Sequence, residues 1–303
     1  MNTVSASLPR IALTVGDPAG IGPEIAARAA ADPAVRAVCE PMVYAPPPTL
    51  VVAPGVLSAE AGQAAFDVIV RAVRDAEAGV VDAIATAPVN KEAFALAGLP
   101  WVGHTDLLAH LTGAPFVAMM FYSQALRVVL ATIHIPLCQV PEVLTQDRLV
   151  TTLRLMAREL PRFGYPSPRI AMAGLNPHAG EHGLFGDEEE RVIIPVLEAC
   201  RADGINVSGP FPGDTVFVRA ARGEFDVVLA CYHDQGLIPV KLLAFGQAVN
   251  VTLGLPIIRT SVDHGTAFDI AGRGIADHGS MVAAVTLAAQ LAQHARASRR
   301  THG

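Results

Sequence analysis

The sequence is poor in aromatic and charged residues. Aromatic side chains make up 5% of the 303 residues and charged side chains 17%, below the ~25% charge usual in soluble domains. So few aromatics, together with many alanines and valines, argue against an all-β sandwich and favour Ala-rich helices packed on Val- and Ile-rich strands. The shortage of charge favours an oligomer, because buried interfaces are depleted in charged residues.

Cysteines and long apolar runs are also scarce. No C-x-x-C pair occurs, and cysteine beside an apolar run acts as a small hydrophobe, so we expect a reducing, cytoplasmic environment without a disulfide framework. No uncharged apolar run reaches about 18 residues, which argues against a membrane span, and the N-terminus lacks a signal-peptide pattern. The cysteines are Cys39, Cys138, Cys200 and Cys231.

The chain lacks any run of basic residues and carries a net charge of -6. A nucleic-acid partner is therefore not expected. An acidic protein that binds an anionic substrate must place its cations locally, and Lys241 and Arg259 are the candidates for that task.

Apolar runs alternate with helical patterns along the chain. Buried parallel strands have continuously apolar sequences, so this alternation predicts an α/β fold. The chain is long enough for two domains or one large one. The predicted strands are 11–15, 80–87, 126–133, 169–174 and 225–232. Predicted helices begin near Pro23, after a Ser58 cap, near Leu149, with the acidic run at Asp187, and at Ser280, with fraying expected from Ala295.

Two turns carry possible ligand sites. The glycines of Gly16–Gly22 fit neither G-x-G-x-x-G nor a Walker loop, so they indicate a tight turn or a close backbone approach rather than a Rossmann fold. His104 precedes a predicted helix at Leu107 that Thr105 or Asp106 is expected to cap. The start of that helix can bind an anion, although a plain cap explains the same residues.

Polar residues crowd the stretch 225–277, which the glycines and prolines suggest is rich in loops. Loops on a rigid sheet are where catalytic residues gather, so this stretch is the predicted centre of the chemistry. Its candidate residues are His233, Asp234, Lys241, Asn250, Arg259, Asp263, His264 and Asp269.

Three histidines, His134, His178 and His233, each follow a predicted buried strand. The carboxyl ends of strands in open α/β sheets line the ligand crevice, and three imidazoles with an open position make a catalytic metal site. Such an ion stabilises negative charge on a substrate oxygen. A packed core histidine is the alternative for each one, and rival ligands on spacing alone are His182, His264 and His278.

These motifs closely resemble the 4-hydroxythreonine-4-phosphate dehydrogenase family of vitamin B6 biosynthesis, nearly end to end. The family is similar in fold to isocitrate and isopropylmalate dehydrogenases, which implies two α/β/α domains, a central cleft and a homodimer. The segments that carry the resemblance are Gly16–Glu24, Gly103–Thr105, Gly174–Glu181, Tyr232–Gly236, Asn250–Pro256 and Arg259–Thr266.

The resemblance implies a first domain of residues 1–105 plus 255–303 and a second, 106–254, that carries the metal ligands and the dimer interface. It implies a divalent ion (zinc, magnesium or cobalt) held by His134, His178 and His233 of both subunits, and NAD or NADP as cofactor. The implied substrate-binding residues are His104, Thr105, Lys241, Asn250 and Arg259. Catalysis is expected from Lys241 and Asp234, and cofactor binding from Asn250, Asp263 and Asp269.

The family reaction oxidises the C3 hydroxyl of 4-(phosphooxy)-L-threonine, and the β-keto acid then loses carbon dioxide to give 3-amino-2-oxopropyl phosphate. This chain departs from that pattern before Ser58, where the first domain is trimmed. Gly180–Gly186 also looks more like paralogues that act on phosphorylated threonate or erythronate. Paralogues that oxidise cis-dihydrodiol dicarboxylates tend to lose the Gly-His-Thr site kept here.

Two further functions are compatible with the same residues. One is a metal-dependent hydrolase or aldolase, which would work without nicotinamide. The other is a metal- or phosphate-binding protein without turnover, against which Lys241 and Asp234 argue.

Overall fold

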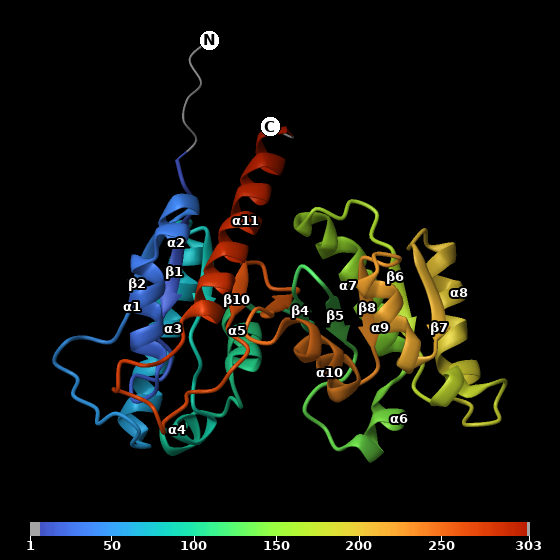
Figure 1. Cartoon of the computed structure of the whole chain (residues 1–303), viewed down its shortest axis with the longest axis horizontal. Helices are drawn as coiled ribbons and strands as arrows, with labels where there is room; N and C mark the ends of the chain where they lie inside the picture. The colour runs from blue at the N-terminus through green and yellow to red at the C-terminus, as the bar shows by residue number, and fades with distance from the viewer. Residues whose placement is uncertain (1–6, 302–303) are drawn as a thin grey trace, which may run out of the picture. The chain divides into compact units, whose positions relative to one another are not determined.

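The computed structural model describes residues 7–301 and forms two compact units. The first unit contains the chain up to Val117 and from Leu255 onward, and the second is Ala118–Gly254. Helices alternate with strands in both units (Figure 1), which confirms the predicted α/β class.

The strands of the first unit run parallel in the order β2-β1-β3-β10. They are β1 (Arg10–Thr14), β2 (Glu40–Tyr44), β3 (Ala83–Thr86) and β10 (Arg259–Ser261). The helices are α1 (Gly22–Ala31), α2 (Pro33–Val38), α3 (Ala59–Glu77), α4 (Lys91–Leu96), α5 (His104–Thr112) and α11 (Gly279–Thr301).

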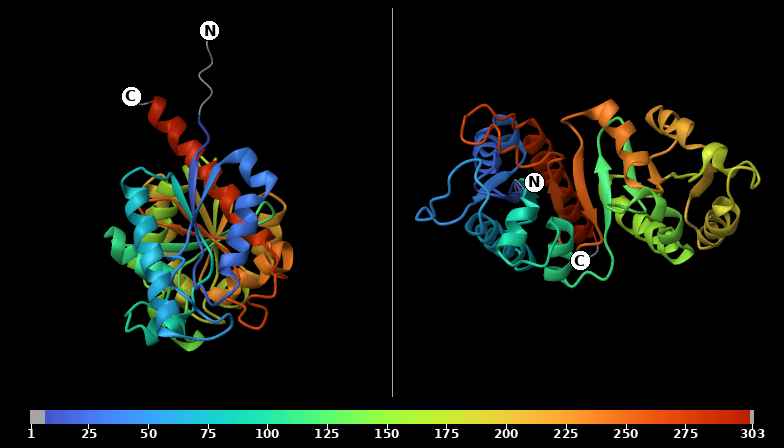
Figure 2. Two further views of the ribbon diagram at one scale, coloured as in Figure 1. Left: turned by 90° about the vertical axis from the view of Figure 1, so that its left-hand side faces the viewer. Right: turned by 90° about the horizontal axis from the view of Figure 1, so that it is seen from below.

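Successive residues of β1 face two separate cores. Ile11 and Leu13 pack with Met281 of α11 in one core, whereas Ala12 packs with Ile69 of α3 in the other. The left view of Figure 2 shows α3 (cyan) and α1 (blue) on opposite sides of these strands. Helices on both faces explain why the strand sequences are continuously apolar.

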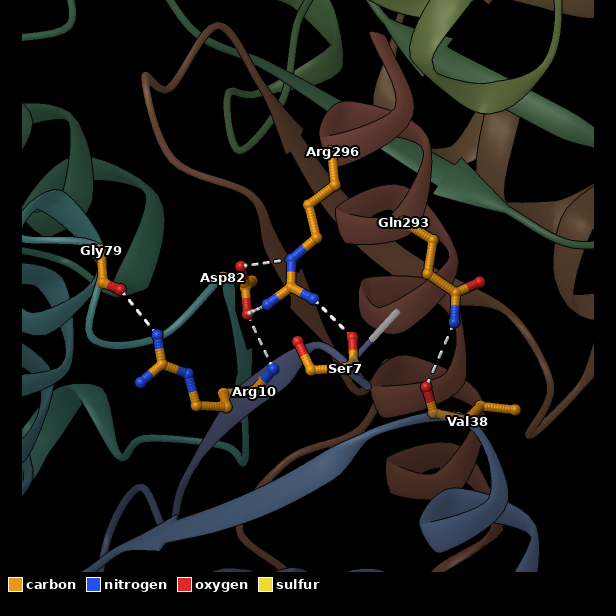
Figure 3. Close-up of polar contacts among 7 residues, drawn as sticks. All are labelled: Ser7, Arg10, Val38, Gly79, Asp82, Gln293 and Arg296. Carbon is orange, nitrogen blue, oxygen red and sulfur yellow. Dashed lines mark hydrogen bonds and ion pairs between the residues drawn. The ribbon is translucent and has the colours of Figure 1, made fainter. Parts of the chain in front are cut away.

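Helix α11 is held to the start of the sheet by a polar cluster (Figure 3). Arg296 donates to both carboxylate oxygens of Asp82, at 2.9 and 2.7 Å, and to the carbonyl of Ser7 at 2.7 Å. Asp82 also accepts the backbone N–H of Arg10 at 2.8 Å. One carboxylate therefore joins β1, the start of β3 and the last helix.

The second unit has the strand order β9-β4-β5-β8-β6-β7. Pairing is parallel from β5 to β7, whereas β4 runs antiparallel to both β5 and β9. The strands are β4 (Ala118–Tyr122), β5 (Arg127–Leu130), β6 (Ile170–Ala173), β7 (Val207–Phe211), β8 (Val227–Ala230) and β9 (Val249–Leu253). The α-helices are α6 (Val140–Val143), α7 (Gln146–Glu159), α8 (Ile194–Ala202), α9 (Gly213–Ala221) and α10 (His233–Ala244).

Short 3₁₀ and π turns complete the second unit. They are η1 (Leu137–Gln139), η2 (Leu160–Phe163), η3 (Pro177–Gly180) and the π turn η4 (Glu189–Ile193). Val216 of α9 and Val240 of α10 pack on Val128 and Val228 of the sheet, so α9 and α10 cover one face of it.

Three local predictions were wrong. Helix α5 starts at His104 after Gly103, with no side-chain cap from Thr105 or Asp106. Helix α11 does not end near Ala295 but continues to Thr301. The centre of the chemistry is less loop-rich than predicted, because Lys241 lies within α10 and Asn250 within β9.

Other local predictions were confirmed. The Ser58 hydroxyl caps α3 by accepting the N–H of Ala61 at 3.1 Å. A Cβ on Gly22 would lie 1.8 Å from the carbonyl oxygen of Val15, so this glycine serves close packing against another element. The four cysteines are free thiols, and among residues 7–301 no helix is long and apolar enough to cross a membrane.

Candidate active site

The strands that precede the three predicted metal ligands are neighbours. Strands β5, β8 and β6 lie side by side and parallel, so their carboxyl ends share one edge of the second unit's sheet. His134 follows β5, His233 opens α10 directly after β8, and His178 follows β6 within η3. This is the edge at which open α/β sheets bind ligands.

His134 and His233 form a pair, with ring centroids 5.5 Å apart. Two imidazoles on one tetrahedral zinc, with Zn–N bonds of about 2.0–2.1 Å, place their ring centroids about 5 Å apart. The Nδ1 of His233 lies 2.7 Å from the Oδ1 of Asp234, and a carboxylate there leaves Nε2 as the metal-binding nitrogen. The pair therefore fits a divalent ion.

His178 lies on a strained loop after β6. Its φ angle is 53° and that of Ala179 is 54°, values that residues other than glycine rarely adopt. The ring of His178 contacts Phe185, with centroids 5.9 Å apart. Within residues 7–301 no group of three or more His, Cys, Asp or Glu side chains is placed to hold a metal ion.

The rival histidines have different surroundings. His182 is exposed on the same loop as His178. His264 and His278 belong to the first unit, where His278 faces Asp32 at 3.5 Å.

A cavity of about 620 Å³ lies within the second unit beside the His178 loop. His178, Tyr232 and Asp234 line it together with the apolar side chains of Ile238 and Leu242. The cavity thus joins the predicted metal ligand to one face of α10. Lys241 is on this helix too, and its separation of seven residues places it on the helix face of Asp234.

Asn250, predicted to bind substrate and cofactor, lies opposite Phe121 in the β9–β4 pair. Its side-chain Oδ1 is buried and has no hydrogen-bond partner among the described residues. An unsatisfied buried acceptor costs free energy, and ligand sites often supply the missing donor.

In the first unit His104 and Arg259 come together. Arg259 is 2% exposed and donates to the Thr86 hydroxyl at 2.8 Å. Burial lowers the pKa of Arg259 to about 9, which still leaves it charged at neutral pH. Burial and the nearby Arg259 charge lower the pKa of His104 well below its usual range, so His104 is a neutral imidazole.

The His104 Nε2 is buried and lacks a hydrogen-bond partner among the described residues. His104 and Thr105 are the first residues of α5, whose N–H groups and dipole favour an anion. A buried guanidinium, a helix start and an unpartnered ring nitrogen together form a polar cluster whose chemistry suits a phosphate or carboxylate, here called the anion site.

The predicted cofactor residues Asp263 and Asp269 lie in the segment that follows β10. Asp263 is half-buried and Asp269 is exposed. This segment packs on the glycine turn after β1, where Ile21 donates its N–H to the carbonyl of Thr266 at 3.0 Å. The turn also holds Asp17, a buried carboxyl whose pKa is raised by burial and to which sequence reasoning gave no role.

The chain matches the family model described as "Pyridoxal phosphate biosynthetic protein PdxA" over residues 19–288. The chain belongs to the PdxA family. This confirms the family resemblance drawn from the motifs.

Curated relatives in this family carry two different names. A "4-hydroxythreonine-4-phosphate dehydrogenase" of Desulforapulum autotrophicum is 46% identical over 332 residues, covering 96% of this chain and 98% of the relative. A "D-threonate 4-phosphate dehydrogenase" of Cupriavidus necator is 45% identical over 329 residues, covering 95% of this chain and 99% of the relative.

Solved structures agree with the fold. The crystal structure of a 4-hydroxythreonine-4-phosphate dehydrogenase from Klebsiella pneumoniae has a TM-score of 0.87 and 45% identity, covering 95% of this chain and all (100%) of the other. A β-decarboxylating dehydrogenase from Thermococcus kodakarensis shares only the fold, with a TM-score of 0.53 and 16% identity over 93% of this chain and 82% of the other. The predicted likeness to the isocitrate dehydrogenase type of fold is thereby confirmed.

Proposed function

We propose that this PdxA-family chain is an NAD-dependent, metal-dependent dehydrogenase for the C3 secondary alcohol of 4-(phosphooxy)-L-threonine or a close phosphorylated analogue. The observation that carries the substrate class is the anion site of the first unit. The anion site combines the buried charge of Arg259 with the unpartnered Nε2 of His104. Both groups suit a terminal phosphate better than a neutral hydroxyl.

His134, His178 and His233 are the proposed holders of the divalent ion, which supplies charge stabilisation for an oxygen of the substrate. Asp234 holds the ring of His233 by its bond to Nδ1. Zinc suits the three-imidazole donor set, with magnesium and cobalt as the other candidates. For the nicotinamide, NADP is the alternative to NAD.

Lys241 is the proposed proton carrier, and Asp234 lies on the same face of α10 two turns before it. The nicotinamide, when bound, would supply the acceptor for the C3 hydride, and the Lys241 Nζ would take the proton of the C3 hydroxyl. When the bond between C2 and the carboxylate carbon breaks and carbon dioxide leaves, Nζ would return that proton to C2. Asn250 supplies its unpartnered Oδ1 to a donor of the substrate or cofactor, and Asp263 and Asp269 are proposed to contact the cofactor.

D-Threonate 4-phosphate, or a similar sugar acid phosphate, is the second candidate substrate. The relative from Cupriavidus necator that carries this name is 45% identical, close to the 46% of the 4-hydroxythreonine phosphate dehydrogenase. The two substrates share the phosphate and the oxidised hydroxyl and differ in the group beside the carboxylate. If no substrate gives NADH, the result would favour a metal-dependent hydrolase or aldolase, or a binding protein without turnover.

The decisive experiment follows NADH formation with each phosphorylated substrate, its dephosphorylated form and a cis-dihydrodiol dicarboxylate. We expect at least a tenfold preference in kcat/KM for a phosphorylated substrate, because one charge-assisted contact contributes about 1.5–3 kcal/mol. His104→Ala should abolish the preference, whereas His110→Ala, an exposed histidine on the same helix, should keep it. Equal kcat/KM with and without phosphate would refute the proposed substrate class.

We further propose a cytoplasmic homodimer with shared metal sites. Ile238 and Leu242 on α10 and Phe245 directly after it are 59%, 81% and 83% exposed, and large apolar side chains exposed together mark an interaction surface. A second copy of the chain is the proposed occupant. Helix α10 begins with His233, and residues of this helix line the 620 Å³ cavity together with His178.

Mixed dimers of inactive variants test this sharing. Because His134 and His233 lie together in one chain, we expect mixtures of their Ala variants to stay inactive. If the partner subunit supplies His178, mixing His178→Ala with His233→Ala leaves one site whole and recovers about half of the activity per dimer. His182→Ala, on the same loop, should remain active alone. No recovery in any combination, with heterodimers verified by mass, would exclude sharing.

A further inference from the structure

The loop that carries His178 closes around a buried carboxylate. Glu189 is 1% exposed, although it belongs to an acidic run that the sequence presents as the solvated start of a helix. A buried carboxylate is costly unless hydrogen bonds satisfy it. The hydrogen bonds resolved for the Glu189 carboxylate all come from the two residues after Gly174, within the loop that leads to His178.

The bonds are short and charge-assisted. Oε1 accepts the backbone N–H groups of Leu175 and Asn176, at 2.7 and 2.8 Å, and Oε2 accepts the Asn176 side-chain amide at 2.9 Å. Bonds of this type are about twice as strong as neutral ones. They fix the backbone directly before Pro177 and His178.

Glycines on both sides of His178 make room for this carboxylate. A Cβ on Gly174 would lie 3.2 Å from Oε1, and a Cβ on Gly180 would lie 2.8 Å from Oε2. The carboxylate therefore occupies the inside of the loop. Any side chain at Gly180 would meet it.

The loop needs such support because it is strained. His178 and Ala179 have positive φ angles, and a strained backbone persists only where its surroundings over-determine it. At the other side the Gln235 side chain, on α10, bonds the Gly174 carbonyl and the Cys231 N–H, both at 2.7 Å. The ends of β6 and β8 are thus tied together beside the loop.

A π turn directs Glu189 inward. The segment Glu189–Ile193 is π-helical, and single π turns are frequent at functional sites. Glu190, the next residue, is exposed. Within the acidic run the Glu189 carboxylate is thus buried inside the loop and Glu190 lies in solvent, whereas the half-buried Glu188 accepts the Asn176 side-chain amide at 2.6 Å.

We propose that Glu189 is a positioning residue that holds the His178 loop in its metal-binding conformation. This inference rests on the proposed metal site. Residues that orient metal ligands typically change metal affinity by 10–100-fold when replaced. Glu189 acts on the backbone that carries the ligand rather than on the imidazole itself.

Zinc binding to the metal-stripped full-length protein tests the proposal. We expect Glu189→Gln and Glu189→Ala to raise the Kd for zinc at least tenfold and to alter the Co²⁺ absorption spectrum. Raising the metal concentration should restore activity. Glu190→Gln removes the same charge from an exposed neighbour, and Glu159→Gln alters a buried carboxylate of the same unit that pairs with arginines. Both controls should bind zinc as the wild type does.

Two results would overturn the proposal: wild-type zinc affinity in folded Glu189→Gln protein, or an equal loss in Glu159→Gln, which would indicate a general effect of stability. If Glu189→Ala does not fold, Glu189→Gln decides. Hydrogen exchange at the Leu175 and Asn176 amides, measured without metal, should be faster in Glu189→Gln than in wild type. Unchanged exchange refutes the loop-holding role alone, whereas no zinc binding by the wild type refutes the metal site as well.

Discussion

Replacing Arg259 by methionine should weaken function and strengthen the ligand-free fold at the same time. The guanidinium is 2% exposed, and burial lowers its pKa from 12.5 to about 9. At about 1.36 kcal/mol for each tenfold change in acidity, burial opposes the charged form by roughly 5 kcal/mol. The buried charge of Arg259 therefore lowers the free energy of unfolding at every pH below its folded-state pKa.

Only part of that cost returns as stability when the charge is removed. Arg259→Met loses the hydrogen bond to Thr86 and the other contacts of the guanidinium, at about 1 kcal/mol for each hydrogen bond, together with some packing. Replacing buried ionic groups by apolar groups of similar volume is often neutral or stabilising by ~1–4 kcal/mol. We expect a gain of about 2 kcal/mol in the free energy of unfolding, or about 4–8 °C in Tm for a unit of this size. The kcat/KM for the phosphorylated substrate should fall about 10–150-fold, because a charge-assisted contact of ~1.5–3 kcal/mol is lost.

Thermal unfolding without ligands and steady-state NADH assays measure the two effects. Arg36→Met is the matched control, because Arg36 is an exposed arginine of the same unit whose Nε donates to the Ala30 carbonyl at 3.0 Å. Arg36→Met should leave both quantities unchanged. A lower Tm in Arg259→Met together with an unchanged phosphate preference would show that Arg259 stabilises the fold and does not bind the anion.

Three further outcomes are expected. Burial and the nearby Arg259 lower the pKa of His104, so the unfolded state binds a proton at higher pH than the folded state, and stability should fall as pH drops below about 6.5. His104→Gln should reduce that decline when unfolding is measured as a function of pH. Parallel stability curves for wild type and variant would contradict this. Asp82→Ala should lower the free energy of unfolding in urea by ~1–3 kcal/mol, because the ion pair with Arg296 and the hydrogen bond from the Arg10 N–H are lost. A change under about 0.5 kcal/mol would contradict this role of Asp82. Gly22→Ala should yield little soluble protein, because its Cβ would lie 1.8 Å from the Val15 carbonyl oxygen; normal yield and Tm would show that the turn can relax.

Local pattern was enough to predict five strands, though not their limits, and it missed five others. The predicted strands are β1, β3, β5, β6 and β8, and the missed ones are β2, β4, β7, β9 and β10. The apolar run 225–232 contains β8, yet pairing with β5 and β6 covers only Val227–Ala230. The cap at Ser58 was predictable because a hydroxyl and the next amides are adjacent in the chain. The start of α5 was not, since Gly103 precedes His104 without any side-chain bond.

By itself, the sequence determined the α/β class, the family, and the placement of His134, His178 and His233 after buried strands. These features depend on residue types and spacings within short segments. Tertiary structure alone decided that β5, β8 and β6 are neighbours, that His104 lies beside Arg259, and that Glu189 turns inward under the His178 loop. Those relations join residues far apart in the chain or depend on a single π turn, and neither periodicity nor spacing encodes which distant partner a buried charge will meet.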